Sequence, residues 1–185
     1  MSDWFETRAG LLERAWMILK DSVLDASHPA RLVSFSTVAP DGMPESRNVV
    51  LRKANADDFI CEVHTDIESS KIRSLRGNPN AALLWWIPSD DLQIRLRGAI
   101  EIVQGDQVDD DWEQVPASSR ISYGTEPFPG TSIEDALGYT KPPVRDRFCV
   151  LRVRAEFIDL TYLGEDHRRA SYTRACDWEG QWLSP

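Results

Sequence analysis

Short segments of alternating polar and apolar residues, separated by turn sequences, constrain the fold of this chain most strongly. "RLVSFSTVA" (31–39) alternates, "PDG" (40–42) is typical of a turn, and "ESRNVVLRK" (45–53) is extended again. Residues 31–53 are therefore expected to form a β-hairpin. Further strands are expected at 59–65, 81–87, 92–103, 147–163 and 167–174, with a last strand signal in the closing "WEGQWLSP".

Only two clear helices accompany these strands. Residues 4–25 carry apolar residues at helical spacing, and "SHPA" ends this amphipathic helix. A short helix follows the strand at 59–65 and stops at "GNPN". Residues 105–143 mix short helical pieces with loops rich in Pro and Gly. The pattern predicts a mainly β (α+β) fold, a closed or nearly closed antiparallel barrel with an N-terminal helix and a few short helices.

Length and charge narrow the class of protein further. We expect one domain over residues 1–185, because 185 residues suit one domain with a substantial core. The net charge of −9 argues against nonspecific binding to nucleic acid or to an anionic membrane. No apolar run approaches ~18 residues and no signal sequence is visible, so a cytoplasmic protein is expected. Cys61, Cys149 and Cys176 lack metal-binding spacing and are expected to be reduced thiols, with no metal site.

The segment "HTDIESSKIRSL" (64–75) is a candidate phosphate site. Ser69 and Ser70 place hydroxyls at the start of a helix, where free backbone N–H groups attract anions, and Lys71 adds a full charge. The alternative is a capped surface helix that binds nothing. The case is stronger if another strand brings cations to the same place.

The segment "SRNVVLRK" (46–53) can supply such cations. Arg47 and Arg52 are five positions apart, so in a regular strand they face opposite sides. Arginine suits bidentate phosphate contact, although a solvated outer face is the alternative for either residue. Gln93, in "LQIRLRG", could read the polar edge of a heterocycle or face water.

Taken in order, "SRNVVLRK", "HTDIESSK" and "LQIRLRG" resemble the motif set of the pyridoxamine 5′-phosphate oxidase-like, FMN-binding split-barrel family. The resemblance covers about residues 30–104 and resumes in the last 35 or so residues, with "AEF", "HRRASYTR" and a closing "W…LSP". It implies a split β-barrel, a homodimer and FMN held at the subunit interface. The middle segment "EPFPG" resembles a branch of FMN-binding proteins distinct from the oxidases proper.

The resemblance also implies where FMN would bind. Arg47 and Lys71 match the phosphate ligands, and Ser70 stands where the family often has arginine. Thr65 matches a threonine near the ribityl chain and phosphate, and His64 stands where an aromatic residue is usual. The remaining matches lie around the flavin ring: Val49, Val50 and Leu51 through their backbone, Arg52 on the substrate side, Gln93 from the neighbouring subunit, and Arg169.

Two departures from the family pattern concern the substrate. Val115 falls near the place of an arginine that grips the substrate phosphate, although Ser119 can be aligned with the accompanying serine. Glu165-Asp166-His167 replaces an Arg-x-His motif. A carboxylate in place of a phosphate-binding arginine repels a phosphate dianion, so oxidation of pyridoxamine phosphate is not expected.

The sequence thus favours an FMN-dependent oxidoreductase acting on a small molecule. The alternatives are a flavin-binding or sensing module without dedicated catalysis, and a groove that holds another large cofactor such as haem or a deazaflavin. His167 could be a catalytic acid or part of a charged strand edge. The pairs Trp85–Trp86 and Trp178–Trp182 could stack on a ligand or pack in the core or an interface, and Asp109–Asp111 is expected to be a solvated helix start.

Overall fold

The computed structural model describes residues 3–185 and has an eight-stranded sheet as its main feature. The strands are β1 (Leu32–Val38), β2 (Pro44–Asn55), β3 (Ile60–Asp66), β4 (Asn80–Ile87), β5 (Leu92–Val103), β6 (Phe148–Tyr162), β7 (Arg168–Thr173) and β8 (Gln181–Leu183). The helices are α1 (Arg8–Leu24), α2 (Ser70–Gly77), α3 (Asp109–Gln114) and α4 (Ala117–Arg120). All the strands expected from alternation are present.

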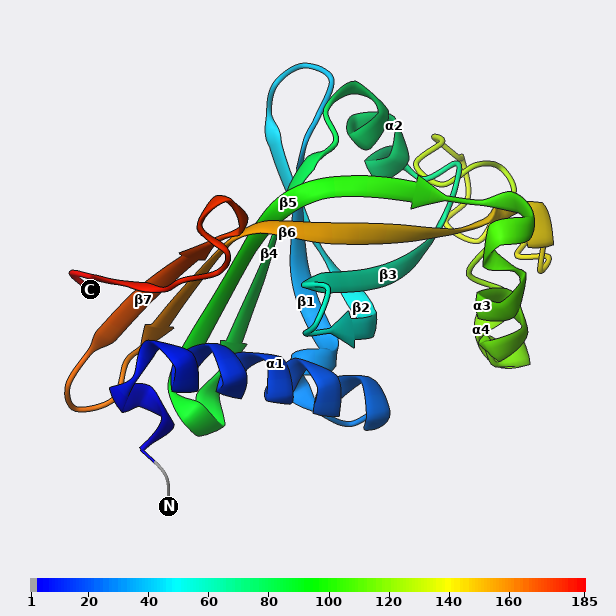
Figure 1. Cartoon of the computed structure of the whole chain (residues 1–185). Coiled ribbons are helices and arrows are strands. Elements are labelled where there is room, and N and C mark those ends of the chain that lie inside the picture. The colour runs from blue at the N-terminus through cyan, green and yellow to red at the C-terminus, as the bar shows by residue number, and fades with distance from the viewer. Residues whose placement is uncertain (1–2) are drawn as a thin grey trace.

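The strand order closes a barrel. The sheet runs β3-β2-β1-β4-β5-β6-β7-β8, and β3 also pairs with β6, so the strands from β1 to β6 form a ring. β7 and β8 continue the sheet beyond β6, outside the ring (Figure 1). Every pairing is antiparallel, and the long β5–β6 ladder extends from Leu92 opposite Tyr162 to Val103 opposite Val150. The predicted split β-barrel is confirmed.

Alternation decides which side chains fill the barrel. Along β5, Leu92, Ile94 and Leu96 are buried while the intervening residues are partly or fully exposed. α1 lies across one end of the barrel (Figure 1) and buries Leu11 and Leu19 against it. The helix begins at Arg8 rather than at residue 4, because the Thr7 hydroxyl accepts a hydrogen bond from the Gly10 N–H and caps it.

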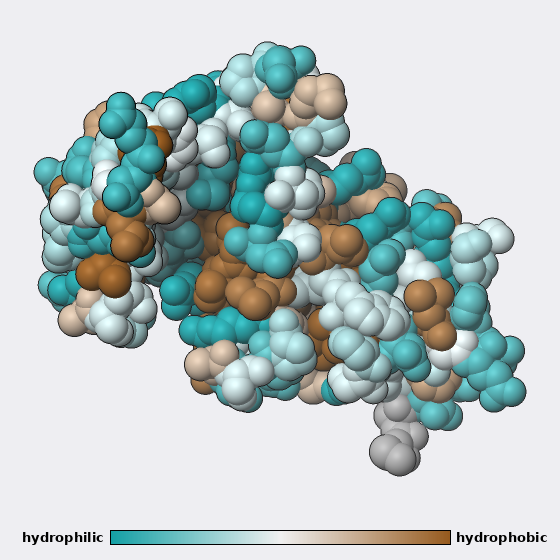
Figure 2. Space-filling model, turned by 180° about the vertical axis from the view of Figure 1, so that it is seen from behind, coloured by the Kyte–Doolittle hydropathy of each residue, from teal (hydrophilic) through white to brown (hydrophobic). Residues whose placement is uncertain are grey.

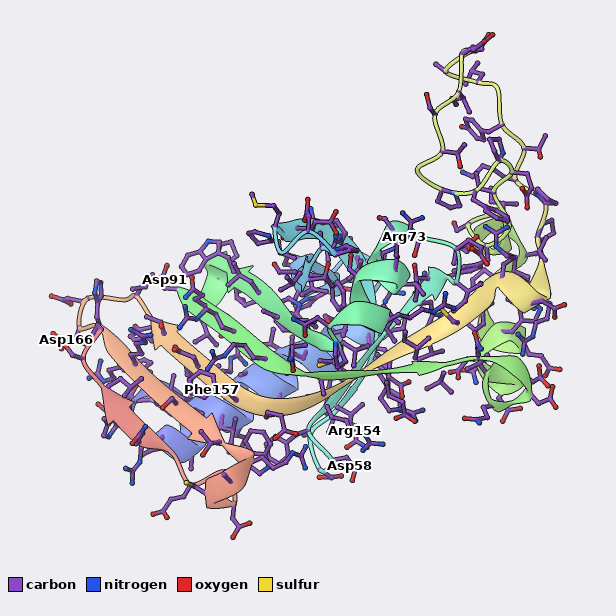
Figure 3. The ribbon with its side chains drawn as sticks, turned by 90° about the horizontal axis from the view of Figure 1, so that it is seen from above. Asp58, Arg73, Asp91, Arg154, Phe157 and Asp166 are labelled. Carbon is purple, nitrogen blue, oxygen red and sulfur yellow. The ribbon has the colours of Figure 1, made fainter. Side chains whose placement is uncertain are left out.

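The segment after β5 is the least regular part of the chain. β5 and β6 extend together away from the β7–β8 end and carry α3, α4 and the loops up to residue 147 at their far end (Figure 3). A second small core joins this segment to the barrel; its members are Val103, Val108, Val115, Tyr123, Phe148 and Val150. Asp109–Asp111 open α3, as expected.

The aromatic pairs divide between core and surface. Trp85 is buried, and its indole N–H donates to the Ala30 carbonyl at 3.0 Å. Trp86 and Trp182 are 47% and 45% exposed. Figure 2 shows apolar side chains gathered near the middle of the face opposite that of Figure 1. Within residues 3–185, no helix has the length and hydropathy required to span a lipid bilayer.

Candidate cofactor site

A groove of about 430 Å³ lies between β2, β3, the start of α2 and the irregular segment 122–141. Its lining includes many of the residues expected from the sequence. From the barrel side come Asn48, Val49, Val50, Arg52, His64, Thr65, Asp66, Ser69 and Lys71, and from the irregular segment come Ser122, Tyr123, Thr125, Pro129 and Lys141. We call this space the cofactor groove.

β2 is irregular at Arg52, which lines the groove. β2 and β3 pair at Leu51 opposite Val63 and again from Lys53 opposite Glu62 to Asn55 opposite Ile60, so Arg52 has no partner residue on β3. Such a bulge re-aims a side chain and leaves the ladder locally unpaired. The Arg52 Nε is buried and has no hydrogen-bond partner within residues 3–185. Leu51 is buried, so alternation places Val50 and Arg52 on the same side of β2, and both line the groove.

Lys71 lies at the other end of the groove. Its ammonium donates to the Thr65 hydroxyl at 2.7 Å, and that hydroxyl lies 3.2 Å from the Ser69 hydroxyl. Ser69 is the N-cap residue of α2, but its side chain makes no capping bond to the helix. Burial lowers the pKa of Lys71, and the nearby Arg47 lowers it further. These features make a cationic, hydroxyl-rich site at a helix start.

Asp66 brings a carboxylate to the lining of the groove, and it is already neutralised. Arg147 donates to both oxygens of its carboxylate at 2.9 Å, and both side chains are buried. Among the ion pairs formed by residues 3–185, none involves Lys71. A partly buried ammonium without a carboxylate partner favours an external anion.

His64 separates the cofactor groove from a neighbouring pocket. Burial lowers its pKa to about 4, with a further contribution from Arg52, so the imidazole is neutral at pH 7. Its ring meets Phe148 edge to face, with the centroids 4.9 Å apart. The His64 Nδ1 is buried and has no hydrogen-bond partner among the described residues. A buried, unsatisfied ring nitrogen is costly unless a ligand completes it.

These observations test whether the groove fits FMN. FMN carries a terminal phosphate and a flat ring with polar edges, and so needs a cation at one end and hydrogen-bonding groups along the other. The cation for the phosphate is Lys71, which lies with the hydroxyls of Thr65 and Ser69. The hydrogen-bonding groups for the ring are the unsatisfied nitrogens of Arg52 and His64. The residues present fit the cofactor.

Five expected residues do not line the groove: Arg47, Leu51 and Ser70, which lie near it in sequence, and Gln93 and Arg169. Arg47 donates to the Glu45 carboxylate at 2.9 Å and to the Thr37 hydroxyl at 2.7 Å. Ser70 is exposed outside the lining, where Ser69 takes its expected place. The Leu51 side chain is fully buried in the core. The assignment of these residues to FMN contact remains a prediction.

Gln93 and Arg169 lie together, but on a different surface. Gln93 is opposite Thr161 on β6, and Thr161 is opposite Arg169 on β7, so the three form one row across the sheet. Arg169 is tied to Asp159 at 2.9 Å. Neither Gln93 nor Arg169 lines the cofactor groove of the same chain. Contact of Gln93 and Arg169 with FMN, by Gln93 from a neighbouring subunit, remains a prediction.

A second pocket, also of about 430 Å³, adjoins the cofactor groove and shares Arg52 and His64 with it. Glu62 lies in this pocket, 2% exposed, and accepts from Arg152 at 2.7 Å. Asp111 also lines it, and burial together with the charge of Glu62 raises the Asp111 pKa. Val115 presents an apolar side chain. Arg31, Arg52 and Lys53 line it as well. We call this space the acidic pocket, after its two carboxylates, Glu62 and Asp111.

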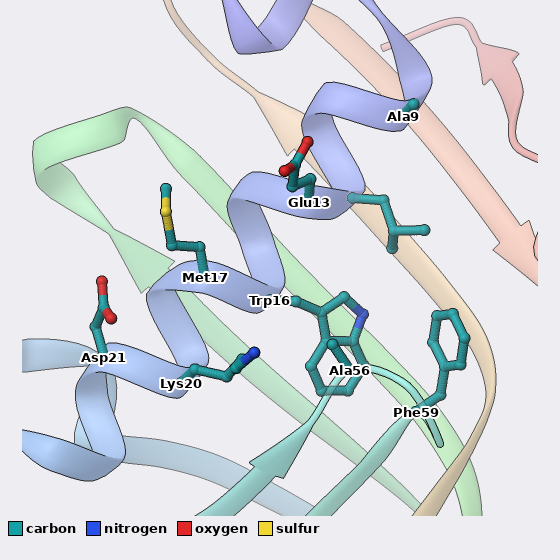
Figure 4. Close-up of a pocket in the computed structure, with 9 residues that line it drawn as sticks. Ala9, Glu13, Trp16, Met17, Lys20, Asp21, Ala56 and Phe59 are labelled. Carbon is teal, nitrogen blue, oxygen red and sulfur yellow. The ribbon is translucent and has the colours of Figure 1, made fainter.

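The other residues considered from the sequence lie elsewhere. Glu165, Asp166 and His167 form an exposed turn between β6 and β7, and Asp166 lies at the opposite end of the molecule from α3 (Figure 3). A further pocket of about 680 Å³ lies beside α1 and is lined by Trp16, Phe59 and other mainly apolar residues (Figure 4). Its only cationic lining residue is the exposed Lys20, so it does not match a phosphorylated cofactor.

Sequence reasoning missed the contribution of the irregular segment. Ser122, Tyr123, Thr125 and Lys141 line the groove, yet they lie in loops without periodicity, so no pattern indicated which of them would face it.

Comparison with known proteins agrees with this site. A family model described as pyridoxamine 5′-phosphate oxidase, FMN-binding domain, matches residues 13–104, which include β1 to β5. A pyridoxine/pyridoxamine 5′-phosphate oxidase from Azorhizobium caulinodans is 30% identical over 186 residues, covering 90% of this chain and 86% of the relative. The chain belongs to the pyridoxamine 5′-phosphate oxidase family of FMN-binding proteins. FMN is accordingly its cofactor.

Other relatives place the chain at some distance from the named oxidases. The oxidase from Sinorhizobium fredii is 29% identical over 147 residues, which cover 80% of this chain but only 65% of that relative. Among solved structures, an FMN-binding protein from Nostoc punctiforme related to pyridoxamine 5′-phosphate oxidase superposes with a TM-score of 0.72 at 24% identity, covering 100% of this chain and 98% of that one. PhzG from Burkholderia lata, solved with tetrahydrophenazine-1-carboxylic acid, gives 0.74 at 19% identity, covering 94% and 91%. These structural likenesses support the fold.

Proposed function

We propose that the protein is an FMN-dependent oxidoreductase that binds a small-molecule substrate in the acidic pocket. The observation that carries this proposal is that Arg52 and His64 line both the cofactor groove and the acidic pocket. A molecule in one space is therefore separated from a molecule in the other by two side chains. Bound FMN supplies the electron-accepting chemistry, and the protein supplies binding and orientation.

The chain's own residues have separate parts in this proposal. Lys71, Thr65 and Ser69 hold the cofactor phosphate at the start of α2. Arg52 provides a guanidinium that favours negative charge on the neighbouring ring or substrate. His64 is neutral at pH 7, so it can accept a hydrogen bond at one ring nitrogen and donate at the other.

The acidic pocket lacks one cation expected in the oxidases proper, because Val115 stands near its place. Arg31, Arg52 and Lys53 still line the pocket. The Asp111 carboxylate, which forms no ion pair among residues 3–185, would repel a phosphate placed against it. Two like charges ~4 Å apart repel by roughly 4 kcal/mol at an effective dielectric of about 20. We therefore expect negligible oxidation of pyridoxine or pyridoxamine 5′-phosphate by the FMN-loaded protein. Formation of pyridoxal 5′-phosphate at a rate typical of these oxidases would contradict this.

We further propose a homodimer in which the row Gln93–Thr161–Arg169 meets the cofactor groove of the second subunit. This row faces away from the core, and Trp86, directly opposite Gln93 on β4, is largely exposed beside it. Light scattering should give twice the chain mass. A stable monomer at micromolar concentration that still holds flavin would exclude this arrangement.

The decisive experiment is the absorption spectrum of the purified protein, followed by anaerobic reduction with NADH or NADPH. The proposal predicts a flavin spectrum that is bleached by the reductant and restored by an acceptor over many cycles. A flavin spectrum that no donor bleaches would favour a flavin-binding module without dedicated catalysis. A protein that binds no added FMN would contradict the proposal altogether.

A further inference from the structure

The irregular segment 122–141 is held over the cofactor groove by a buried ionic connection. Near the start of the segment, Tyr123 is buried in the second small core. The next residue, Gly124, donates its N–H to the Asp66 carboxylate at 2.8 Å. Arg147, which follows the segment and directly precedes β6, binds the same carboxylate and also donates to Glu126 at 2.9 Å. Asp66 directly follows Thr65, so the segment is attached beside the residues that hold Lys71.

A single bridge then fixes the orientation of two groove residues. Glu126 and Thr140 pair antiparallel, with backbone hydrogen bonds of 2.9 and 2.8 Å in the two directions. In such a pair the neighbouring residues, Thr125 and Lys141, also lie opposite each other, and their side chains project to the face opposite that of the bridged pair. Both Thr125 and Lys141 line the cofactor groove, which agrees with this geometry.

Gly124 makes the close approach of the two strands possible. Its φ of +131° is a conformation that favours glycine, and a Cβ there would lie 2.1 Å from the Pro142 carbonyl oxygen. Any side chain at this position would push residues 124 and 142 apart. Gly124 is next to Thr125, and Pro142 is next to Lys141. The positions of Thr125 and Lys141 therefore depend on a glycine at residue 124.

The charges at this end of the groove are unbalanced. Lys71 and Lys141 both line it, and neither takes part in an ion pair formed by residues 3–185. Asp66, which also lines it, is neutralised by Arg147. Lys71 on the barrel side and the exposed Lys141 on the irregular side therefore line one space, and Thr125 belongs to the same lining.

We infer that Thr125 and Lys141 form the second half of the FMN phosphate site, so that segment 122–141 clamps the phosphate against Lys71, Thr65 and Ser69. This inference rests on the proposed function. It adds a specificity device, because a clamp that closes on a phosphomonoester discriminates FMN from riboflavin by charge. The barrel side alone would provide one lysine, Lys71, and the segment adds a second, Lys141.

The test is a set of FMN and riboflavin titrations, followed by flavin fluorescence, on the full-length protein. Lys141→Met should weaken FMN binding about tenfold and leave riboflavin binding unchanged, since only FMN carries the charge. Lys20→Met, which removes an exposed lysine on α1 away from the groove, is the matched control and should change neither affinity. The loss in Lys141→Met should shrink at high salt.

A second pair of variants tests the clamp geometry without removing charge. Gly124→Ala should reproduce most of the FMN loss, and adding Lys141→Met to it should cost little more, because the ammonium has already moved away. Gly130→Ala is the matched control: its φ is +90° but its Cβ would meet no atom within 4 Å, so FMN affinity should be retained.

The outcomes separate this inference from the proposed function. If wild-type protein binds no FMN, the proposed function fails. If it binds FMN but Lys141→Met binds FMN as tightly, or loses riboflavin affinity by the same factor, the phosphate clamp is wrong while the cofactor site stands. Additive losses in Gly124→Ala and Lys141→Met would show that the glycine does not position the lysine.

Discussion

The two sides of the cofactor groove are built by different means. The barrel side consists of β2, β3 and the start of α2, where strand register and a helix start place Val50, Arg52, Thr65 and Lys71. The opposite side is segment 122–141, which has one isolated bridge and no strand of its own. A backbone ladder orients the first side, whereas one buried carboxylate, Asp66, holds the second.

Because of this difference, substitutions on the two sides of the groove should have consequences of different size. Hydrogen bonds in a ladder are many and individually replaceable, so single changes in β2 or β3 are buffered by their neighbours. The irregular side depends on a connection in which Arg147 and Gly124 share one acceptor residue, and the loss of any member leaves buried polar groups unpaired. Changes at Asp66 or Arg147 should therefore have the larger consequences.

The largest expected effect comes from Arg147→Met. This change leaves the Asp66 carboxylate buried and without its partner, which typically costs about 3–5 kcal/mol of stability. Urea unfolding should report the loss. Combining Arg147→Met with Asp66→Asn removes the uncompensated charge, so the double variant should be more stable than Arg147→Met alone. A double variant that is less stable by the sum of both single changes would show that the pair is not coupled.

Acidification should lower the stability of the protein through His64, which lies on the barrel side of the groove. Its folded-state pKa of about 4 lies below the ordinary value of 6.5, so between these values the unfolded chain binds more protons than the folded one. The stability that neutral His64 contributes is present above pH 6.5 and is lost as the pH falls toward 4. The full difference corresponds to roughly 3 kcal/mol. His64→Phe, which keeps a ring against Phe148, should lose less stability over this interval than wild type in parallel urea titrations.

Lys71→Met addresses the barrel side directly. Removing a charge-assisted contact to phosphate should weaken FMN binding by about 1.5–3 kcal/mol, measured by isothermal titration. Lys53→Met is the control, because the Lys53 side chain is 58% exposed and its contact with Glu62 is long, at 3.8 Å; it should change FMN affinity by less than about 1 kcal/mol. A larger loss in Lys53→Met would mean that the phosphate lies in the acidic pocket.

The sequence predicted the barrel side of the groove but not the irregular side. Alternation gave β5 as residues 92–103, the bounds that the structure has, and the order of motifs indicated the FMN groove with Val49, Val50, Arg52, His64, Thr65, Ser69 and Lys71 in its lining. These residues lie on regular elements or at their ends, where local spacing determines direction. No spacing rule indicates the bulge after Leu51, which leaves Arg52 without a partner residue on β3.

The irregular side could not be predicted for a physical reason. Thr125 and Lys141 are 16 positions apart, and the segment that carries them is attached to the barrel through Asp66, more than 50 positions earlier, which accepts hydrogen bonds from Gly124 and Arg147. A contact that depends on three distant residues leaves no periodic trace. Arg47 is a different case: its motif indicates a phosphate ligand, and in this chain its guanidinium also pairs with the Glu45 carboxylate.

The smallest expected effect is that of Asp109→Asn. This variant tests whether the stability of the irregular region depends on how many ion pairs it has or on how deeply they are buried. Arg145 pairs with Asp109 at the start of α3, only two positions from Arg147, but the Asp109 side chain is 57% exposed against 5% for Asp66. Water screens an exposed pair, and such pairs contribute about 0–1 kcal/mol. Asp109→Asn should therefore leave the urea midpoint and FMN affinity nearly unchanged, while Arg145 keeps its hydrogen bond to the Gly105 carbonyl at 2.9 Å. If Asp109→Asn destabilised the protein as much as Arg147→Met, the irregular segment would be held by its whole set of surface charges, and the central position given to Asp66 would be wrong.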